Sequence, residues 1–238
     1  MTPHPHAHDT AGSVISRRQA LALFAAPAVL AVAGCRAGAA DGDPLTGSCL
    51  VRPEMTEGPF YLDDALVRRD IRDGSAGVPL ALTIGVSRVA GASCEPLAGA
   101  AVDVWHADAA GRYSGVGPVR DERFLRGTQV TDADGAATFV TVYPGWYPGR
   151  TPHVHVKVRA DAGGGRTHAF TSQLFFDDAL SESLYRSAAP YAERGPQNVT
   201  NARDGIFRRG GDEMLLALAE ADGGGYAAAF DLAMVLDR

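Results

Sequence analysis

Cysteine is scarce in this chain, with three residues among 238. That number is too small for a miniprotein held together by disulfides or for a zinc site of four thiolates. Basic charge is also in short supply, because 22 Lys and Arg stand against 28 Asp and Glu and no Lys/Arg run forms a basic face. Nucleic acid is therefore not an expected partner. The hydrophobic fraction of 46% is too high for a disordered chain, so the sequence predicts one compact domain of roughly 150–200 residues behind a leader.

Residues 1–35 have the pattern of an export signal. Arg17 and Arg18 form a twin-arginine pair, and the apolar run Leu21–Ala33 behind them is too short to cross a bilayer comfortably. The run leads into the letters V-A-G-C, which are similar to the lipobox of bacterial lipoproteins, with Cys35 as the acylated residue. A plain cleavage site is the alternative. We expect twin-arginine export to an extracytoplasmic location, with a lipid anchor at Cys35 on the outer face of the cell membrane as the membrane attachment.

The remaining two cysteines lie behind this leader. Residues 36–47 are small and polar and are interpreted as a tether, followed by a single domain at 48–238. An oxidising destination allows Cys49 and Cys94 to pair, and a bridge of this span could stabilise the fold by up to roughly 4 kcal/mol. Two separate buried thiols are the alternative.

Most of the domain alternates apolar residues with polar or small ones, which indicates half-buried strands. Many short strands separated by turns predict an all-β fold, an antiparallel β-sandwich with long loops and few short helices. The segment 178–186 is a candidate short helix. The segments 214–219 and 226–235 are ambiguous, although Gly223–Gly225 favours two strands joined by a turn. The other predicted strands are 78–86, 101–107, 127–131, 137–142, 153–159 and 169–176, with 132–135 as a hairpin turn between the third and fourth of these.

His153 and His155 lie two residues apart on one predicted strand. They would project together from the face opposite to Val154, Val156 and Val158, as half of a metal site. A bare His-x-His pattern is more often two independent histidines. The loop before it changes this balance, because three prolines and two glycines within 144–152 stiffen a segment that also carries a tyrosine and an arginine.

Three runs of residues together resemble one enzyme family. Residues 103–113 read D-x-W-x-A-D-x-x-G-x-Y, residues 144–155 read P-G-x-Y-x-x-R-x-P-H-x-H, and residues 56–61 read T-E-G-P-F-Y. They resemble the intradiol ring-cleavage dioxygenases, the catechol and protocatechuate type of non-haem ferric enzymes. The resemblance covers about residues 48–236 and implies a β-sandwich whose loops form a metal site.

The resemblance implies a set of four ligands to one Fe(III): Tyr113, Tyr147, His153 and His155. Phenolate is a hard anionic oxygen donor that suits ferric iron, whereas zinc sites use Cys, His and carboxylates. No acidic residue lies in either run at a position that matches the carboxylate of a two-histidine Fe(II) oxygenase. Tyr143 is a second tyrosine in the same loop, and the register of the family makes it structural.

The resemblance also implies an activity and roles for further residues. A small aromatic diol of the catechol type and O2 would react to a cis,cis-muconate-type diacid that holds both oxygen atoms. Tyr147 would take a substrate proton, and Arg150 would stabilise charge on the ring. Thr56, Pro59, Phe60 and Gln173 would line the substrate site. The sequence leaves open whether the protein forms a homo-oligomer. The alternative functions are a non-catalytic exported β-sandwich binding protein and an inactive iron-binding relative.

Overall fold

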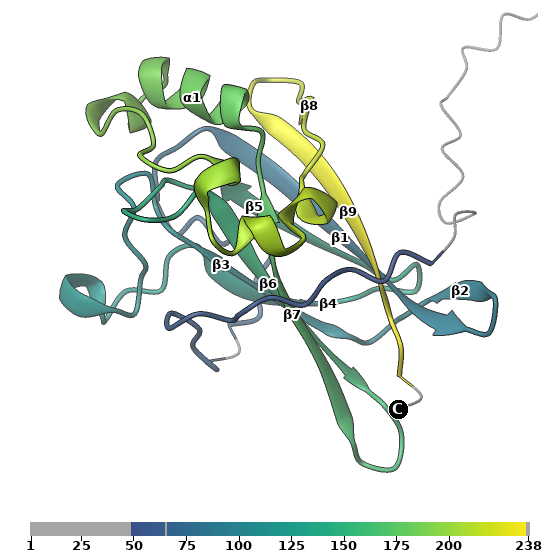
Figure 1. Ribbon diagram of the computed structural model, residues 1–238. Coiled ribbons are helices and arrows are strands. Elements are labelled where there is room, and N and C mark those ends of the chain that lie inside the picture. The colour runs from purple at the N-terminus through teal and green to yellow at the C-terminus, as the bar shows by residue number, and fades with distance from the viewer. Residues whose placement is uncertain (1–48, 65, 237–238) are drawn as a thin grey trace, which may run out of the picture. The chain divides into compact units, whose positions relative to one another are not determined.

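Two sheets contain the strands of the computed structural model, which describes residues 49–64 and 66–236 (Figure 1). These residues belong to one unit, Pro44–Arg238. The predicted leader at 1–35, with Cys35, and the tether at 36–47 lie outside the described residues. None of the helices within the described part of the chain is long and apolar enough to cross a membrane.

The first sheet is centred on β1, Pro79–Ala90. β1 pairs antiparallel with β2, Ser93–Pro96, and with β5, Ala136–Val142. On its other side it pairs parallel with β9, Tyr226–Met234, which lies beside it in Figure 1. The two-residue strand β8, Ala219–Glu220, completes the sheet beyond β9.

The second sheet has the order β4-β3-β6-β7, and every neighbouring pair is antiparallel. Its strands are β3 at Ala101–His106, β4 at Arg126–Val130, β6 at His153–Asp161 and β7 at Thr167–Phe175.

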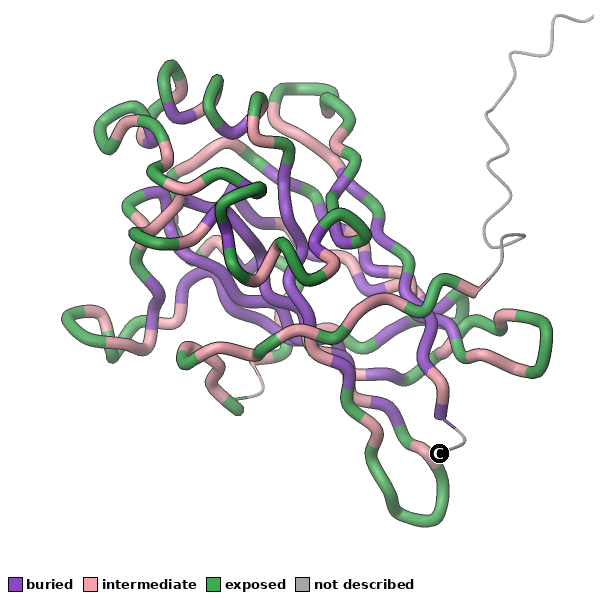
Figure 2. The backbone as a smooth tube through the Cα atoms, viewed as in Figure 1, coloured by how far each residue is buried: buried purple, intermediate pink, exposed green. Residues whose placement is uncertain are grey.

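The core lies between the two sheets. Val154, Val156 and Val158 of β6 are fully buried and pack in one cluster with Leu80 and Leu82 of β1. The period of two along β6 therefore turns the histidines to the outer face of the second sheet. Figure 2 shows buried residues running through the strands, whereas the β6–β7 turn is exposed.

The segment between β7 and β8 contains helix α1 and several 3-10 turns. Helix α1, Asp178–Ser187, begins where the Asp177 side chain accepts a hydrogen bond from the Leu180 amide. Four short 3-10 turns follow, and another lies between β3 and β4. Their bounds are η1 Gly117–Val119, η2 Tyr191–Glu193, η3 Asn201–Arg203, η4 Phe207–Arg209 and η5 Gly211–Met214.

The predicted all-β sandwich is confirmed, with corrections in detail. The turn at 132–135 forms, and Asp132 Oδ1 accepts hydrogen bonds from the amides of Asp134 and Ala136. It does not close a hairpin, however, because β4 pairs with β3 in one sheet and β5 pairs with β1 in the other. The sandwich is also not wholly antiparallel, since β1 and β9 are parallel. Of the ambiguous segments, 226–235 lies mostly in β9. The segment 214–219 is largely irregular and connects η5 to the first residue of β8.

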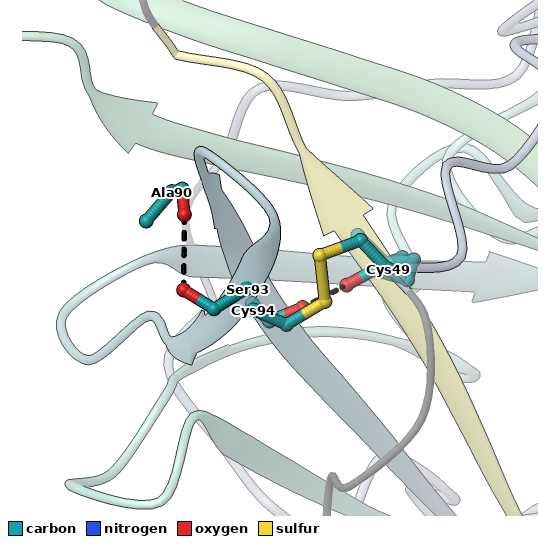
Figure 3. Close-up of a disulfide and its surroundings, with 6 residues drawn as sticks. Cys49, Ala90, Ser93 and Cys94 are labelled. Carbon is teal, nitrogen blue, oxygen red and sulfur yellow. Dashed lines mark hydrogen bonds between the residues drawn. A yellow bond between two sulfur atoms is a disulfide. The ribbon is translucent and has the colours of Figure 1, made fainter.

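Cys49 and Cys94 form a disulfide, with their Cα atoms 5.4 Å apart (Figure 3). The bond ties the start of the described chain to β2. Ser93 Oγ donates a hydrogen bond to the carbonyl oxygen of Ala90 and closes the turn between β1 and β2. The segment behind Cys49 then crosses the edge of the first sheet, where the Ala233 amide donates to the carbonyl of Leu50.

Candidate metal centre

His153 and His155 lie on the outer face of the second sheet, yet each is only 2% exposed. His155 faces Trp105 of β3 on one side and Gln173 of β7 on the other in the strand register. The Trp105 indole stacks on the His155 ring with 4.7 Å between centroids and 8° between planes. This stack fixes the orientation of the imidazole.

Tyr113 reaches the histidines through a tight turn after β3. The Asp108 carboxylate accepts hydrogen bonds from the amides of Ala110 and Arg112, and the Gly111 amide donates to the Asp108 carbonyl. Gly111 has φ +78°, and a Cβ there would overlap the carbonyl oxygen of Trp146. Only glycine fits this position, and it aims the following tyrosine back at the sheet.

Tyr147 lies in the proline-rich loop 144–152, which packs backbone to backbone against that turn. The Gly145 amide donates to the carbonyl of Ala107 across 3.4 Å, and a Cβ at Gly145 would overlap the carbonyl of Asp108. The two glycines therefore let the two loops approach closely. As a result the rings of Tyr113 and Tyr147 lie with centroids 5.7 Å apart.

Both phenol oxygens converge on one ring nitrogen. Tyr113 Oη lies 3.4 Å and Tyr147 Oη 3.3 Å from Nε2 of His153. The rings of His153 and His155 have centroids 4.8 Å apart. Ligands about 2.1 Å from a shared ion and roughly 90–110° apart are separated by about 3.0–3.4 Å. The spacing of the two phenol oxygens from His153 Nε2 is thus compatible with one common ion, and the His155 ring lies next to this group.

The imidazole nitrogens are ready to bind a cation. Nδ1 of His153 donates to the carbonyl of Thr151 across 2.7 Å, which leaves Nε2 with its lone pair. Both ring nitrogens of His155 are buried without a hydrogen-bond partner. Burial, and next the positive Arg150, lowers the pKa of His153 to about 3. Burial also lowers the pKa of His155 well below its usual value, so both rings are neutral at pH 7.

The pKa values of the two phenols shift upward, in the direction opposite to those of the histidines. Burial raises the pKa of Tyr113 well above its usual value and raises that of Tyr147 as well. A metal cation reverses this effect, because its charge stabilises the phenolate. Within residues 49–64 and 66–236, no three His, Cys, Asp or Glu side chains gather to hold a metal. The donors that meet here are two phenols and two imidazoles, a set that fits a hard cation such as ferric iron.

Arg150 extends along the edge of this donor cluster. Its Nε donates to the Asp204 carboxylate across 2.7 Å, and its terminal nitrogens reach Oε1 of Gln173 at 2.5 Å and Oη of Tyr147 at 3.4 Å. Burial disfavours the charged form of Asp204, but hydrogen bonds from the Thr151 amide and Arg150 outweigh this and lower the pKa of the carboxyl. The guanidinium is held in one position.

A strap formed by residues 54–64 covers the cluster. The Phe60 ring stacks on Tyr113 with centroids 4.5 Å apart, and a Cβ added to Gly58 would stand 3.4 Å from Cε1 of His155. Nε2 of Gln173 donates to the carbonyl of Thr56 across 2.9 Å. Among the predicted substrate contacts, Phe60 therefore touches the donor cluster directly, whereas the Gln173 side chain contacts Arg150 and Thr56. Thr56 is linked to the site through the hydrogen bond from Gln173 to its carbonyl, and Pro59 is an exposed residue of the strap.

Sequence reasoning missed several residues that support the centre. Asp204 fixes Arg150. Asp204 lies in a short irregular segment, which has no periodic pattern from which its role could be predicted. Trp105 supports the centre through its stack on the ring of His155. Tyr143 is not one of these residues, because it lies in the core, where its hydroxyl hydrogen-bonds Ser181.

A family model described as Dioxygenase (Dioxygenase_C) matches residues 56–190, which include all four donors. The chain belongs to the intradiol ring-cleavage dioxygenase family. An intradiol ring-cleavage dioxygenase from Tetranychus urticae has a similar structure, with a TM-score of 0.71 and 31% identity over 80% of this chain and 97% of that one.

Curated members of the family are also similar. Catechol 1,2-dioxygenase 1 of Acinetobacter lwoffii is 30% identical over 60% of this chain and 54% of its own length. The protocatechuate 3,4-dioxygenase beta chain of Burkholderia cepacia is 34% identical over 56% of this chain and 60% of its own. The chain thus spans little more than half the length of the curated dioxygenases that it matches.

Proposed function

We propose that this protein is an Fe(III)-dependent dioxygenase that cleaves a catechol-type diol between its two hydroxylated carbons. The observation that carries the proposal is the meeting of two phenol oxygens at Nε2 of His153, beside a buried His155 whose ring nitrogens have no partner. The diol and O2 together contain the atoms of a cis,cis-muconate-type diacid. The reaction therefore needs no external electron donor.

Tyr113, Tyr147, His153 and His155 would hold the iron. When bound, ferric iron supplies Lewis acidity that ionises the phenols and the diol and prepares the ring for reaction with O2. Tyr147 is the more exposed of the two tyrosines, and its Oη lies within reach of Arg150. This oxygen is the base that accepts a proton from the entering diol.

Arg150 and the strap position the substrate. The guanidinium is fixed by Asp204 and Gln173, so it presents positive charge toward the phenol side of the cluster without reorganising. Phe60, stacked on Tyr113, offers an aromatic wall to a planar ring. Burial of the donors keeps water from competing with the substrate.

The test uses the full chain, purified and loaded with ferric iron. We expect one iron per chain, a wine-red phenolate-to-iron absorption band, and oxygen uptake with catechol that yields the diacid. Tyr113→Phe and His155→Ala should bleach the band, whereas Arg150→Ala should keep the band and lose turnover. A colourless protein that binds zinc contradicts the iron assignment. A red protein that consumes no O2 with any catechol is the inactive relative, and a protein that binds no metal is the non-catalytic binding protein.

We further propose, from the sequence, that the protein is exported by the twin-arginine route and acylated at Cys35. Mass spectrometry of the mature protein from its membrane fraction tests this. An acylated N-terminal cysteine is the expected result, and an unmodified chain released into the medium contradicts the anchor.

A further inference from the structure

An apolar cleft of about 280 Å³ opens directly beside the donor cluster. Tyr113 and Phe60 form one wall, and they are the stacked pair that borders the metal centre. The turn around η1 supplies the other lining residues. Its residues are Val116, Gly117, Pro118 and Val119, with Arg112 at the margin.

The cleft adjoins the centre, because Phe60 and Tyr113 belong to both. Tyr113 contacts His153 through its hydroxyl and stacks with Phe60 through its ring face. Val116 packs on the cluster of Trp105 and Tyr113. The cleft is therefore within reach of a substituent on a diol ring bound at the donors.

The arginines around this part of the site are already paired. The Arg112 guanidinium makes two hydrogen bonds to the Asp108 carboxylate, at 2.8 and 2.6 Å. Arg126 donates to the backbone carbonyls of Ser114 and Phe60, at 2.6 and 2.5 Å.

Arg150 is bound to Asp204 and Gln173. A carboxylate that entered the cleft would face mainly apolar side chains and give up part of its hydration. The apolar lining thus favours an apolar ring substituent over an anionic one.

We propose that the cleft binds an apolar substituent on the diol ring, so that the preferred substrates are alkyl- or aryl-substituted catechols rather than carboxylated ones. This inference rests on the proposed function. Val116 and Val119 are the residues that would set this preference, since they are the branched apolar residues that line the cleft together with Phe60 and Tyr113.

The experiment compares kcat/KM of the iron-loaded protein for catechol, 4-ethylcatechol and 3,4-dihydroxybenzoate. Full burial of an ethyl group is worth roughly tenfold. We expect 4-ethylcatechol to exceed catechol by up to that factor and to exceed 3,4-dihydroxybenzoate at least about tenfold. Equal or higher kcat/KM for the carboxylated diol overturns the inference while leaving the proposed function intact.

Two variants test whether the cleft causes the preference for an apolar ring substituent. Val116→Ser should lower the ratio of kcat/KM for 4-ethylcatechol to that for catechol at least about threefold. Val130→Ser, at an exposed valine on β4, is the matched control and should leave the ratio unchanged. An unchanged ratio in Val116→Ser overturns the inference.

If the proposed function is wrong, the protein will bind iron but consume no oxygen with catechol, and this outcome is distinct from a failure of the inference. Anaerobic titration of the visible band then decides the inference by binding alone. Binding of 4-ethylcatechol at least about tenfold tighter than that of 3,4-dihydroxybenzoate supports the cleft, and equal binding overturns it.

Discussion

Arg150 and Asp204 form an ion pair with 2.7 Å between Nε and the carboxylate, although the two residues are 54 positions apart in the chain. The Asp204 side chain is fully buried and also accepts a hydrogen bond from the Thr151 amide. One carboxylate therefore fixes both the arginine and the backbone that enters β6 at His153. The segment behind α1 thereby supports a centre that is built on the second sheet.

The first prediction follows from this pair. Asp204→Asn keeps the shape of the side chain but removes the charge that holds Arg150, so the guanidinium should lose its fixed orientation. We expect kcat/KM with catechol to fall roughly 10- to 100-fold. Iron content and the visible band should stay unchanged, because the four donors remain. The measurements are oxygen uptake and iron analysis on the same sample.

A matched control for this variant is Glu182→Gln, which removes an exposed ion pair with Arg186 on α1. It should leave activity within error. If Asp204→Asn retained full activity, or if it lost its iron, the carboxylate would not act through Arg150.

The outer-face position of the two histidines could be predicted from the sequence, because the period of two along β6 leaves no other place for them. The convergence of Tyr113 and Tyr147 could be inferred only from the resemblance. Its physical cause, the backbone contact at Gly111 and Gly145, joins two loops and leaves no periodic signal. Asp204 could not be predicted for the same reason. The failed hairpin has a related cause, since a tight turn fixes a change of direction but not the sheet that the next strand joins.

The second prediction concerns that backbone contact. Gly111→Ala should separate the turn from the carbonyl of Trp146 and move Tyr113 away from Tyr147. Gly149 also has a positive φ, +87°, but has open space around it, so Gly149→Ala measures the conformational cost alone, about 1–2 kcal/mol. We expect Gly111→Ala to reduce the free energy of unfolding further and to lose iron. Urea unfolding and iron analysis check both variants, and equal behaviour of the two would contradict the role of the loop contact.

The third prediction concerns the strap. Lys157 of β6 forms an ion pair with Glu57 at 2.6 Å and lies 4.1 Å from the centroid of the Tyr61 ring. Lys157→Met removes the pair and loosens the segment that places Phe60 on Tyr113. We expect KM for catechol to rise roughly three- to tenfold, with a smaller change in kcat.

Steady-state kinetics on Arg186→Met is the control for the strap, since this variant breaks an exposed helical ion pair away from the strap. Its KM should stay at the wild-type value. A fall in kcat at constant KM in Lys157→Met would instead assign the lysine to the chemical step.

His106 provides a fourth prediction, on acid stability. It is fully buried at the end of β3, where Nδ1 donates to the carbonyl of Ala107 across 2.9 Å and Nε2 accepts from Thr141 Oγ1 across 2.7 Å. Burial lowers the pKa of His106 to about 4. The ring is therefore neutral in the folded protein at pH values where it would be protonated in the unfolded chain.

Because the pKa of an unfolded histidine is about 6.5, the unfolded state binds the extra proton between roughly pH 6.5 and 4. The stability contributed by neutral His106 is thus fully present above pH 6.5 and is lost as the pH falls toward 4. The loss is on the order of 3 kcal/mol. His106→Asn keeps a donor for Ala107 but has no proton to gain, so its free energy of unfolding should be lower at pH 7 and should fall less between pH 7 and 4.5. Urea unfolding at the two pH values measures this difference, and parallel pH profiles for the variant and the wild type would show that another group controls acid unfolding.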